Sequence, residues 1–425
     1  MKLFFSQIIL FLFISTASSS LLHAQGSAIP PEYLKLDWVI EQALQRNPQI
    51  QAAEWRWHAV EQREPQISSL DDPVLSYSRW LSTPETRVGP QENVLMLAQR
   101  IPFFGKLSLK GEMASHEALA AEQQYHATRR DIIYKVKTVY YDLYWIDNSL
   151  SILNEYQDVL RSFMKVAEGK YRTGIGIQAN VLKADLEISA IEERKLNFIK
   201  MRRGTSARLN ALLNREPQSP LDSPGPLDTS EVPIDTTRIL QAALNRQELQ
   251  EVQAMIRRSE AGVSLARRNY FPDFVLLANY VTIPDGRTSA LDSGKDPYGI
   301  QIGLTVPLWF GKLSAALDEA KAHEQSLQLS YRDLHNQIAA EVMDVLARLR
   351  AAHETVSLYD QQIIPDAERT LASALSSYQT GTLDFLSLLD SERMLLNFRL
   401  ARAKELANYW KQVAALERAV GGTLP

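Results

Sequence analysis

The stretch Phe104-Gly105-Lys106-Leu107 occurs a second time as Phe310-Gly311-Lys312-Leu313, 206 residues further along the chain. Each copy closely follows a proline, Pro102 or Pro307. Apolar residues spaced by seven follow the first copy and recur at the same offset. They are Tyr125, Ile132, Val139, Ile146 and Leu153, matched by Tyr331, Ile338, Val345, Ala352 and Tyr359. A tetrapeptide and a stripe at one offset indicate an internal duplication.

The duplication extends in both directions from this stretch. Tyr171-Arg172-Thr173-Gly174 is matched by Tyr378-Gln379-Thr380-Gly381 at an offset of 207, and Ala43-Leu44-Gln45-Arg46 is matched by Ala243-Leu244-Asn245-Arg246 at an offset of 200. Residues 215–235 are rich in proline, which is typical of an extended connector. We therefore expect two structural repeats, 25–214 and 236–425.

Each repeat is expected to contain the same elements in the same order. These are a short helix, a medium helix, a strand hairpin, a very long helix, a glycine-containing turn and a final helix. The expected ranges are 36–46, 48–70, 73–101, 106–168, 171–176 and 178–213 in the first repeat, and 236–246, 247–270, 272–306, 312–379, 378–382 and 382–420 in the second.

The two long helices dominate this prediction. At 1.5 Å per residue they would span about 95–100 Å, far beyond an ordinary globular helix. Their apolar residues repeat every seven positions, which favours left-handed coiled-coil packing. The medium and final helices of each repeat together match one long helix in length, so we expect them to stack end to end beside it. Pro365 should kink the second long helix.

The strand hairpins are the predicted membrane segment. Tyr298, Ile300, Ile302, Leu304 and Val306 alternate with small or polar residues, as in an outer-membrane strand. No stretch beyond the N-terminus is long and apolar enough for a spanning helix, so a barrel is the remaining way to cross a bilayer. Four strands per chain cannot close a barrel. Two chains would supply eight strands, and three would supply twelve and leave a lumen.

Aromatic residues follow the last strand of each hairpin, as Phe103 and Phe104 in the first repeat and Trp309 and Phe310 in the second. Aromatic side chains gather where a barrel meets the lipid–water interface. We expect these four to contact the membrane interface. The alternative is a soluble four-stranded sheet that caps a helical bundle.

The first residues predict export. Lys2 precedes a short apolar run and then small residues, which is the pattern of a secretory signal peptide. We expect residues 1–24 to be removed, with cleavage after Ala24 or, alternatively, after Ser19.

Composition excludes several classes of protein. The net charge is −4 and the pI is near 6.1, unlike the basic footprint of a nucleic-acid binder. There is no cysteine, which excludes disulfides and thiolate sites. The histidines after the signal peptide have no metal-ligand spacing, and no phosphate loop or nucleophile–base pair is present. We expect no enzyme activity, no cofactor and no dedicated metal site.

With its duplicated helix–hairpin–helix plan and its two Tyr-x-Thr-Gly turns, the chain resembles the TolC-like outer membrane efflux factors over nearly its whole mature length. The run from Tyr378 to Leu396 is especially similar to the family pattern. The run from Pro102 to Lys106 resembles the heavy-metal (CzcC/CusC-like) branch. The resemblance implies a mainly α fold with a small β part. It also implies a homotrimer with a twelve-stranded barrel in the outer membrane of a Gram-negative bacterium and a long periplasmic α-barrel.

The resemblance also implies partners. In that family the helical tips close the duct and meet a periplasmic adaptor, which joins an inner-membrane resistance-nodulation-division pump. The expected adaptor contacts lie in the two turns. They are Tyr171, Arg172, Thr173 and Gly174, with Tyr378, Gln379, Thr380 and Gly381.

Family members can carry paired aspartates after the second turn, where they form an acidic constriction. Asp390 aligns with the second of the pair, whereas Ser387 stands at the first and Asp384 lies one helical turn earlier. These three residues are the candidate periplasmic gate. Asp384 could equally serve only to stabilise a helix N-terminus.

The cargo stays open at this stage. Heavy-metal cations are one possibility, and drugs, other small molecules or a secreted protein are others. A periplasmic coiled-coil adaptor is the alternative outside the channel class, although such a protein would usually have one long hairpin and several β-rich modules.

Overall fold

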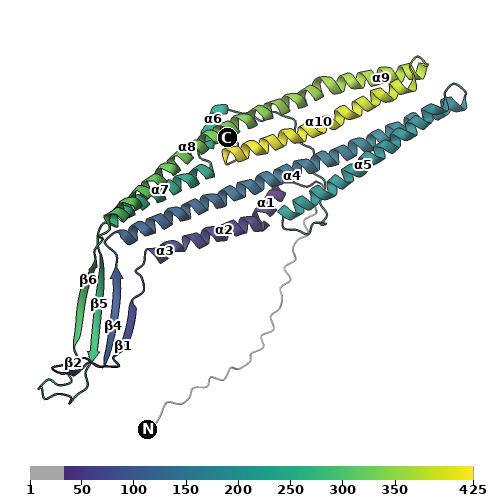
Figure 1. Cartoon of the computed structure of the whole chain (residues 1–425). Coiled ribbons are helices and arrows are strands. Elements are labelled where there is room, and N and C mark those ends of the chain that lie inside the picture. The colour runs from purple at the N-terminus through teal and green to yellow at the C-terminus, as the bar shows by residue number, and fades with distance from the viewer. Residues whose placement is uncertain (1–32, 425) are drawn as a thin grey trace, which may run out of the picture.

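The computed structural model describes residues 33–424, and the predicted signal peptide lies outside this range. The molecule is long, with a strand sheet at one end and two helix-to-helix turns at the other (Figure 1). Ten α-helices and six strands occur in the described chain. The long helices run side by side along the molecule. This is the mainly helical fold with four long strands that the sequence predicts.

The first repeat begins with three helices. They are α1 (Leu36–Arg46), α2 (Pro48–Glu61) and α3 (Arg63–Ile67). The Asn47 side chain caps α2 by accepting hydrogen bonds from the N–H groups of Gln49 and Ile50. The expected single helix 48–70 is wrong, because it breaks at Gln62 and ends at Ile67. Pro65 explains the break, since its ring clashes with the carbonyl of residue 61 in a continuous helix.

The long helix of the first repeat is unbroken. It is α4 (Lys106–Arg172), and it is followed by α5 (Gln178–Leu212). Gly105 precedes α4 at φ +82°, a left-handed conformation that suits glycine. The heptad positions Ile132, Val139, Ile146 and Leu153 are all buried, so the periodic stripe faces the core.

The second repeat follows the same order with one local change. Its helices are α6 (Thr236–Ala243), α7 (Gln247–Arg268), α8 (Phe310–Leu358), α9 (Ile364–Thr380) and α10 (Phe385–Val420). A π-helical turn, η1 (Tyr359–Ile363), joins α8 to α9. It ends two residues before Pro365, and the expected irregularity takes the form of this wider turn, because proline lacks the N–H that an α-helical bond needs.

The four long strands form one antiparallel sheet. They are β1 (Val74–Arg79), β4 (Asn93–Ile101), β5 (Asp273–Thr282) and β6 (Tyr298–Thr305), and the spatial order is β1-β4-β5-β6. A short antiparallel pair, β2 (Glu85–Thr86) with β3 (Gly89–Pro90), lies between β1 and β4. The central pairing of β4 with β5 joins the two repeats. Within the described chain β1 and β6 are the sheet's edges.

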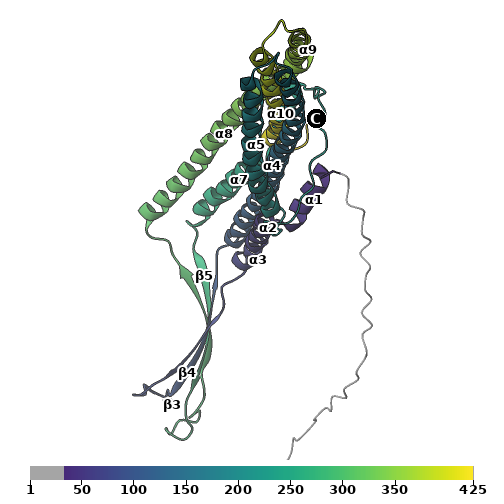
Figure 2. The same ribbon diagram turned by 90° about the vertical axis from the view of Figure 1, so that its right-hand side faces the viewer.

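The helices of each repeat lie together in the layer, and the two repeats meet where α4 packs on α7 and α10. In Figure 1, α7 lies between α8 and α4, and α2 lies on the far side of α4. Toward the turns, α4 packs on α5 and α10, and α10 packs on α8 and α9. Figure 2 shows α8 at one border of this layer. One apolar core lies at mid-length, and a second lies near the turns around Tyr156, Phe385 and Leu388.

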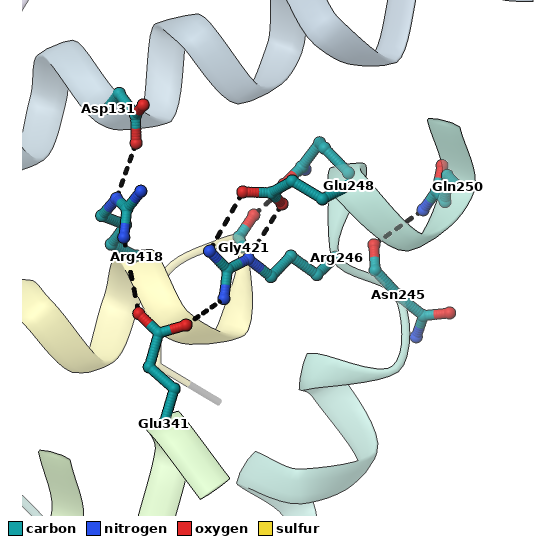
Figure 3. Close-up of polar contacts among 9 residues, drawn as sticks. Asp131, Asn245, Arg246, Glu248, Gln250, Glu341, Arg418 and Gly421 are labelled. Atoms are coloured by element: carbon teal, nitrogen blue, oxygen red, sulfur yellow. Dashed lines mark hydrogen bonds and ion pairs between the residues drawn. The ribbon is translucent and has the colours of Figure 1, made fainter. Parts of the chain in front are cut away.

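An ion-pair network joins four helices at mid-length (Figure 3). Arg246, at the start of α7, donates hydrogen bonds to Glu248 and to Glu341 of α8. Glu341 also accepts from Arg418 of α10, which in turn donates to Asp131 of α4. The guanidinium groups therefore connect the first repeat to the second.

Candidate functional site: the helical turns and the strand junction

The turns at the far end from the sheet carry the predicted adaptor-contact residues. Tyr171 and Arg172 end α4, Thr173 and Gly174 begin the turn to α5, and all four residues are exposed. Gln379 and Thr380 at the end of α9 are exposed, as is Gly381 directly after it. The second turn is shorter than expected, because α9 continues through Thr380 and Gly381 ends it in the left-handed conformation, at φ +82°.

Tyr378 differs from the other turn residues because it is only 5% exposed. Its ring lies 5.5 Å from that of Phe385. Lys170 of α4 donates a hydrogen bond to the Tyr378 carbonyl at 2.6 Å, and its ammonium group lies 3.9 Å from the ring centroid. Tyr378 thus holds the two turns together, and its side chain is withdrawn from the surface.

The three candidate gate residues have different surroundings. Asp384 is the N-cap of α10, and it accepts hydrogen bonds from the N–H and the hydroxyl of Ser387 at 3.0 and 2.9 Å. These bonds, the backbone one foremost, hold the pKa of Asp384 below its ordinary value. Asp384 and Ser387 therefore form a helix cap, the simpler of the two roles considered for Asp384.

Asp390 is the acid left available at this end of α10. Its side chain is 72% exposed, and Arg393 is 3.8 Å away. Arg393 is engaged elsewhere, since it donates two hydrogen bonds to Glu187 of α5 at 2.7 and 3.2 Å. Asp390 shares an open groove between α5 and α10 with Lys183 and Leu186. The weak ion pair leaves its charge largely directed to solvent.

Glu392 was not predicted as a site residue, yet it is the most unusual acid in this region. The residue is 5% exposed, and its Oε2 has no hydrogen-bond partner within residues 33–424. Burial raises the pKa of Glu392, and the positive charge of Arg399 offsets this only in part. Sequence reasoning missed it because the α10 pattern does not show which neighbours surround an acid.

The strand–helix junction is the second notable cluster. Asp273, at the start of β5, accepts hydrogen bonds from Lys106 at 2.8 Å, Arg100 at 2.8 Å and the Phe103 N–H at 2.9 Å. Lys106 is itself buried and also donates to the Phe271 carbonyl. The lysine of the repeated tetrapeptide thus ties the end of one hairpin to the start of the other.

The four predicted interface aromatics lie at this junction. Phe104, Trp309 and Phe310 are exposed, whereas Phe103 stacks on Phe271 with ring centroids 4.7 Å apart. On the sheet itself, Tyr298, Ile300 and Ile302 are exposed apolar side chains. Such a patch is expected of a surface that meets lipid or another protein.

In residues 33–424 no helix has both the length and the apolar character to cross a bilayer. The same residues contain no group of three or more histidine or acidic side chains placed to hold a metal ion.

The family model for outer membrane efflux proteins matches residues 39–215 and 239–422, which is most of the chain and both repeats. The chain belongs to the outer membrane efflux protein family. Its members are efflux channels of the outer membrane, and this chain has their fold and location. The family is one of channels and not of enzymes.

Sequence relatives support the same placement. The chain is 24% identical over 332 residues to the cation efflux system protein CusC of Escherichia coli K12, covering 76% of this chain and 71% of the relative. It is 22% identical over 356 residues to the solvent efflux pump outer membrane protein SrpC of Pseudomonas putida, covering 80% and 73%. It is 22% identical over 341 residues to the probable outer membrane lipoprotein SilC of Salmonella typhimurium, covering 78% and 72%.

Solved structures of other outer-membrane proteins share the fold of this one. CusC superimposes with a TM-score of 0.77 at 19% identity, covering 92% of this chain and 93% of CusC. VceC of Vibrio cholerae superimposes with a TM-score of 0.75 at 22% identity, covering 92% and 97%.

Proposed function

We propose that three copies of this efflux protein assemble into an exit duct, with twelve strands in the outer membrane and the helices in the periplasm. The supporting observation is the four-stranded sheet with its two edges, β1 and β6. An edge left open in hydrocarbon exposes unpaired backbone groups at several kcal/mol each. Pairing β6 of one copy with β1 of the next removes every edge. The side chains of eight strands fill a barrel, whereas twelve leave a lumen.

The proposal assigns the rest of the chain as follows. Residues 25–214 and 236–425 form two structural repeats joined by the connector 215–235, and residues 1–24 are the signal peptide that is removed on export. The exposed aromatics Phe104, Trp309 and Phe310 contact the lipid interface, supported by Phe103. The two turns form the periplasmic tips, because they lie at the opposite end of the helices from the sheet. There they contact a periplasmic adaptor that is joined to an inner-membrane resistance-nodulation-division pump.

The gate is assigned to Asp390 in particular. Threefold symmetry would turn one exposed carboxylate per chain into a ring of three near the axis. Like charges held close together raise the cost of ionisation, so the ring should bind cations or retain protons. Asp384 and Ser387 support the ring by capping α10, as their mutual hydrogen bonds suggest.

Heavy-metal cations are the proposed cargo. The similarity to a cation efflux protein motivates this assignment, while the similarity to a solvent efflux protein keeps organic solutes as the alternative. A conducting path requires weak binding, since a tight site would retain its cargo. The exposed and weakly paired Asp390 fits that requirement.

Two experiments test the proposal. Lysine-reactive cross-linking of the protein purified in detergent should yield a three-chain band, and the protein should conduct ions in planar bilayers. A stable monomer that needs no detergent would refute the duct. A deletion strain should become sensitive to heavy-metal salts, and sensitivity to organic solvents alone would replace the cargo assignment and leave the duct intact.

A further inference from the structure

Two loops contact each other at the end of the sheet that lies furthest from the helices (Figure 1). One loop joins β1 to β4 and contains the short pair β2–β3, and the other joins β5 to β6. The guanidinium group of Arg87 in the first loop donates two hydrogen bonds to the carboxylate of Asp292 in the second, one of them 2.7 Å long. The N–H of Gly294 donates to the Val88 carbonyl at 2.9 Å. The loops of the two repeats therefore form one unit, which we call the outer cap.

The outer cap covers one particular face of the sheet. Residues along a strand alternate between the two faces, whereas cross-strand partners share a face. Tyr280 pairs with Tyr298, which is exposed on the apolar face together with Ile300. Val281, and Ile283 two residues later, therefore lie on the opposite face. These two side chains are only 6% and 5% exposed. The described helices lie at the other end of the sheet, so the loops are what covers them (Figure 1).

β3 is the part of the outer cap that touches this face. Both of its residues, Gly89 and Pro90, are buried. Gly89 has φ +132°, a conformation that favours glycine, and a Cβ at this position would lie only 2.8 Å from Cγ2 of Ile283. A larger residue would therefore force β3 and Ile283 apart. The close approach of the Gly89 backbone keeps the outer cap seated on the sheet.

In the proposed barrel the apolar face contacts lipid, so the opposite face lines the lumen. We infer that the outer cap is a lid over the outer mouth of the duct, held closed by the ion pair between Arg87 and Asp292. The inference rests on the proposed duct and adds a second constriction, at the opposite end from the helical turns. Three such lids, one from each protomer, would narrow the same exit.

The weakness of the ion pair suits a lid that has to open. The side chains of Arg87 and Asp292 are 72% and 37% exposed, so water and salt screen their attraction. Outgoing cargo then needs little force to displace the lid. A bulky solute outside the cell meets a mouth that is closed for most of the time.

Cysteine labelling tests the lid directly, because the natural chain has no cysteine. Gln301 of β6 alternates with Ile300 and Ile302, so it faces the lumen beneath the outer cap. In intact cells, Gln301→Cys should react with a small membrane-impermeant maleimide and only slowly with a maleimide that carries a bulky polyethylene glycol. The matched control is Ile302→Cys, which faces lipid and should react with neither. Any other pattern with the small reagent would overturn the assignment of the faces, and with it the lid.

The ion pair is then broken on the Gln301→Cys background. Arg87→Ala or Asp292→Asn should raise the labelling rate of the bulky reagent by up to about fivefold, the factor that corresponds to about 1 kcal/mol for an exposed pair. The exchange Arg87→Asp with Asp292→Arg should restore the slow rate. Arg287→Ala is the matched control, since it removes an exposed arginine from the same cap and should leave the rate unchanged.

Gly89→Ala opens the lid by a different route, because the added methyl group separates β3 from Ile283. It should also raise the labelling rate of the bulky reagent. Equal rates in the natural latch, in Arg87→Ala and in Gly89→Ala would overturn the lid. If the same protein still forms a trimer and conducts ions in planar bilayers, the proposed duct stands without it. Failure of the natural chain to form a trimer would overturn both.

Discussion

Replacing Arg246 with alanine should markedly destabilise the helical layer. Arg246 is buried, and its guanidinium donates to Glu248 at 2.8 and 3.0 Å and to Glu341 at 2.6 Å. Removal of one partner from a buried ion pair typically costs about 3–5 kcal/mol, because the other charge is left uncompensated. Here the side chains of Glu248 and Glu341 stay 31% and 36% exposed, so solvent screens them. We therefore expect a loss of about 1–3 kcal/mol.

The assay is denaturant unfolding of the protein in detergent, with the loss of helix monitored by far-ultraviolet circular dichroism. Arg238→Ala is the matched control, since Arg238 pairs with Asp235 at 3.4 Å and both side chains are mainly exposed. Such a surface pair contributes about 0–1 kcal/mol. The double variant with Glu341→Ala should be less destabilised than the sum of the two single variants, because neighbours in one network couple. Equal stability of Arg246→Ala and Arg238→Ala would refute the reasoning.

Three further predictions concern the turns and α10. Asp390→Asn should reduce channel block by divalent metal ions in planar bilayers, whereas Asp384→Asn should affect stability more than block; unchanged block in the first variant would remove Asp390 from the gate. Photo-cross-linkers at Arg172 and Gln379 should capture a periplasmic protein in intact cells, and capture of extracellular ligands alone would reverse the proposed orientation. Glu392→Gln should raise the melting temperature at neutral and alkaline pH. The pKa of Glu392 is higher in the folded state than in the unfolded state. The protonated Glu392 side chain therefore contributes its full stability below the unfolded-state pKa, and this contribution is lost as pH rises through the folded-state pKa. The gain should vanish in acid, and a gain independent of pH would contradict this account.

The sequence alone predicted the repetitive parts of the fold well. α4 begins at Lys106 as expected, β4 ends at Ile101, where the first hairpin was expected to end, and β6 ends one residue early, at Thr305. These elements carry long and regular spacings of apolar residues, so each further residue that fits the spacing supports the predicted helix or strand. The break at Gln62 and the π-helical turn before Pro365 are local responses to proline, and periodicity does not show which response a helix takes.

The sequence predicted only part of the candidate site. The turn residues could be named because they follow the ends of duplicated helices. The contacts that hold the turns together were not predicted, since Lys170 and Tyr378 lie 208 residues apart. Arg246 offered a weak signal as the last residue of a repeated tetrapeptide, but its acidic partners lie on other helices.

By itself, the sequence determined the duplicated order of elements, the coiled-coil stripes and the alternation of β6, because each depends on the spacing of neighbouring residues. Only the tertiary structure decided which helices pair, and hence why Asp390 is exposed while Glu392, two residues later, is buried. Two residues on a helix point about 200° apart, and the sequence does not reveal which of those directions another helix will cover. Coverage depends on contacts between distant segments, and those form only when the whole layer is assembled.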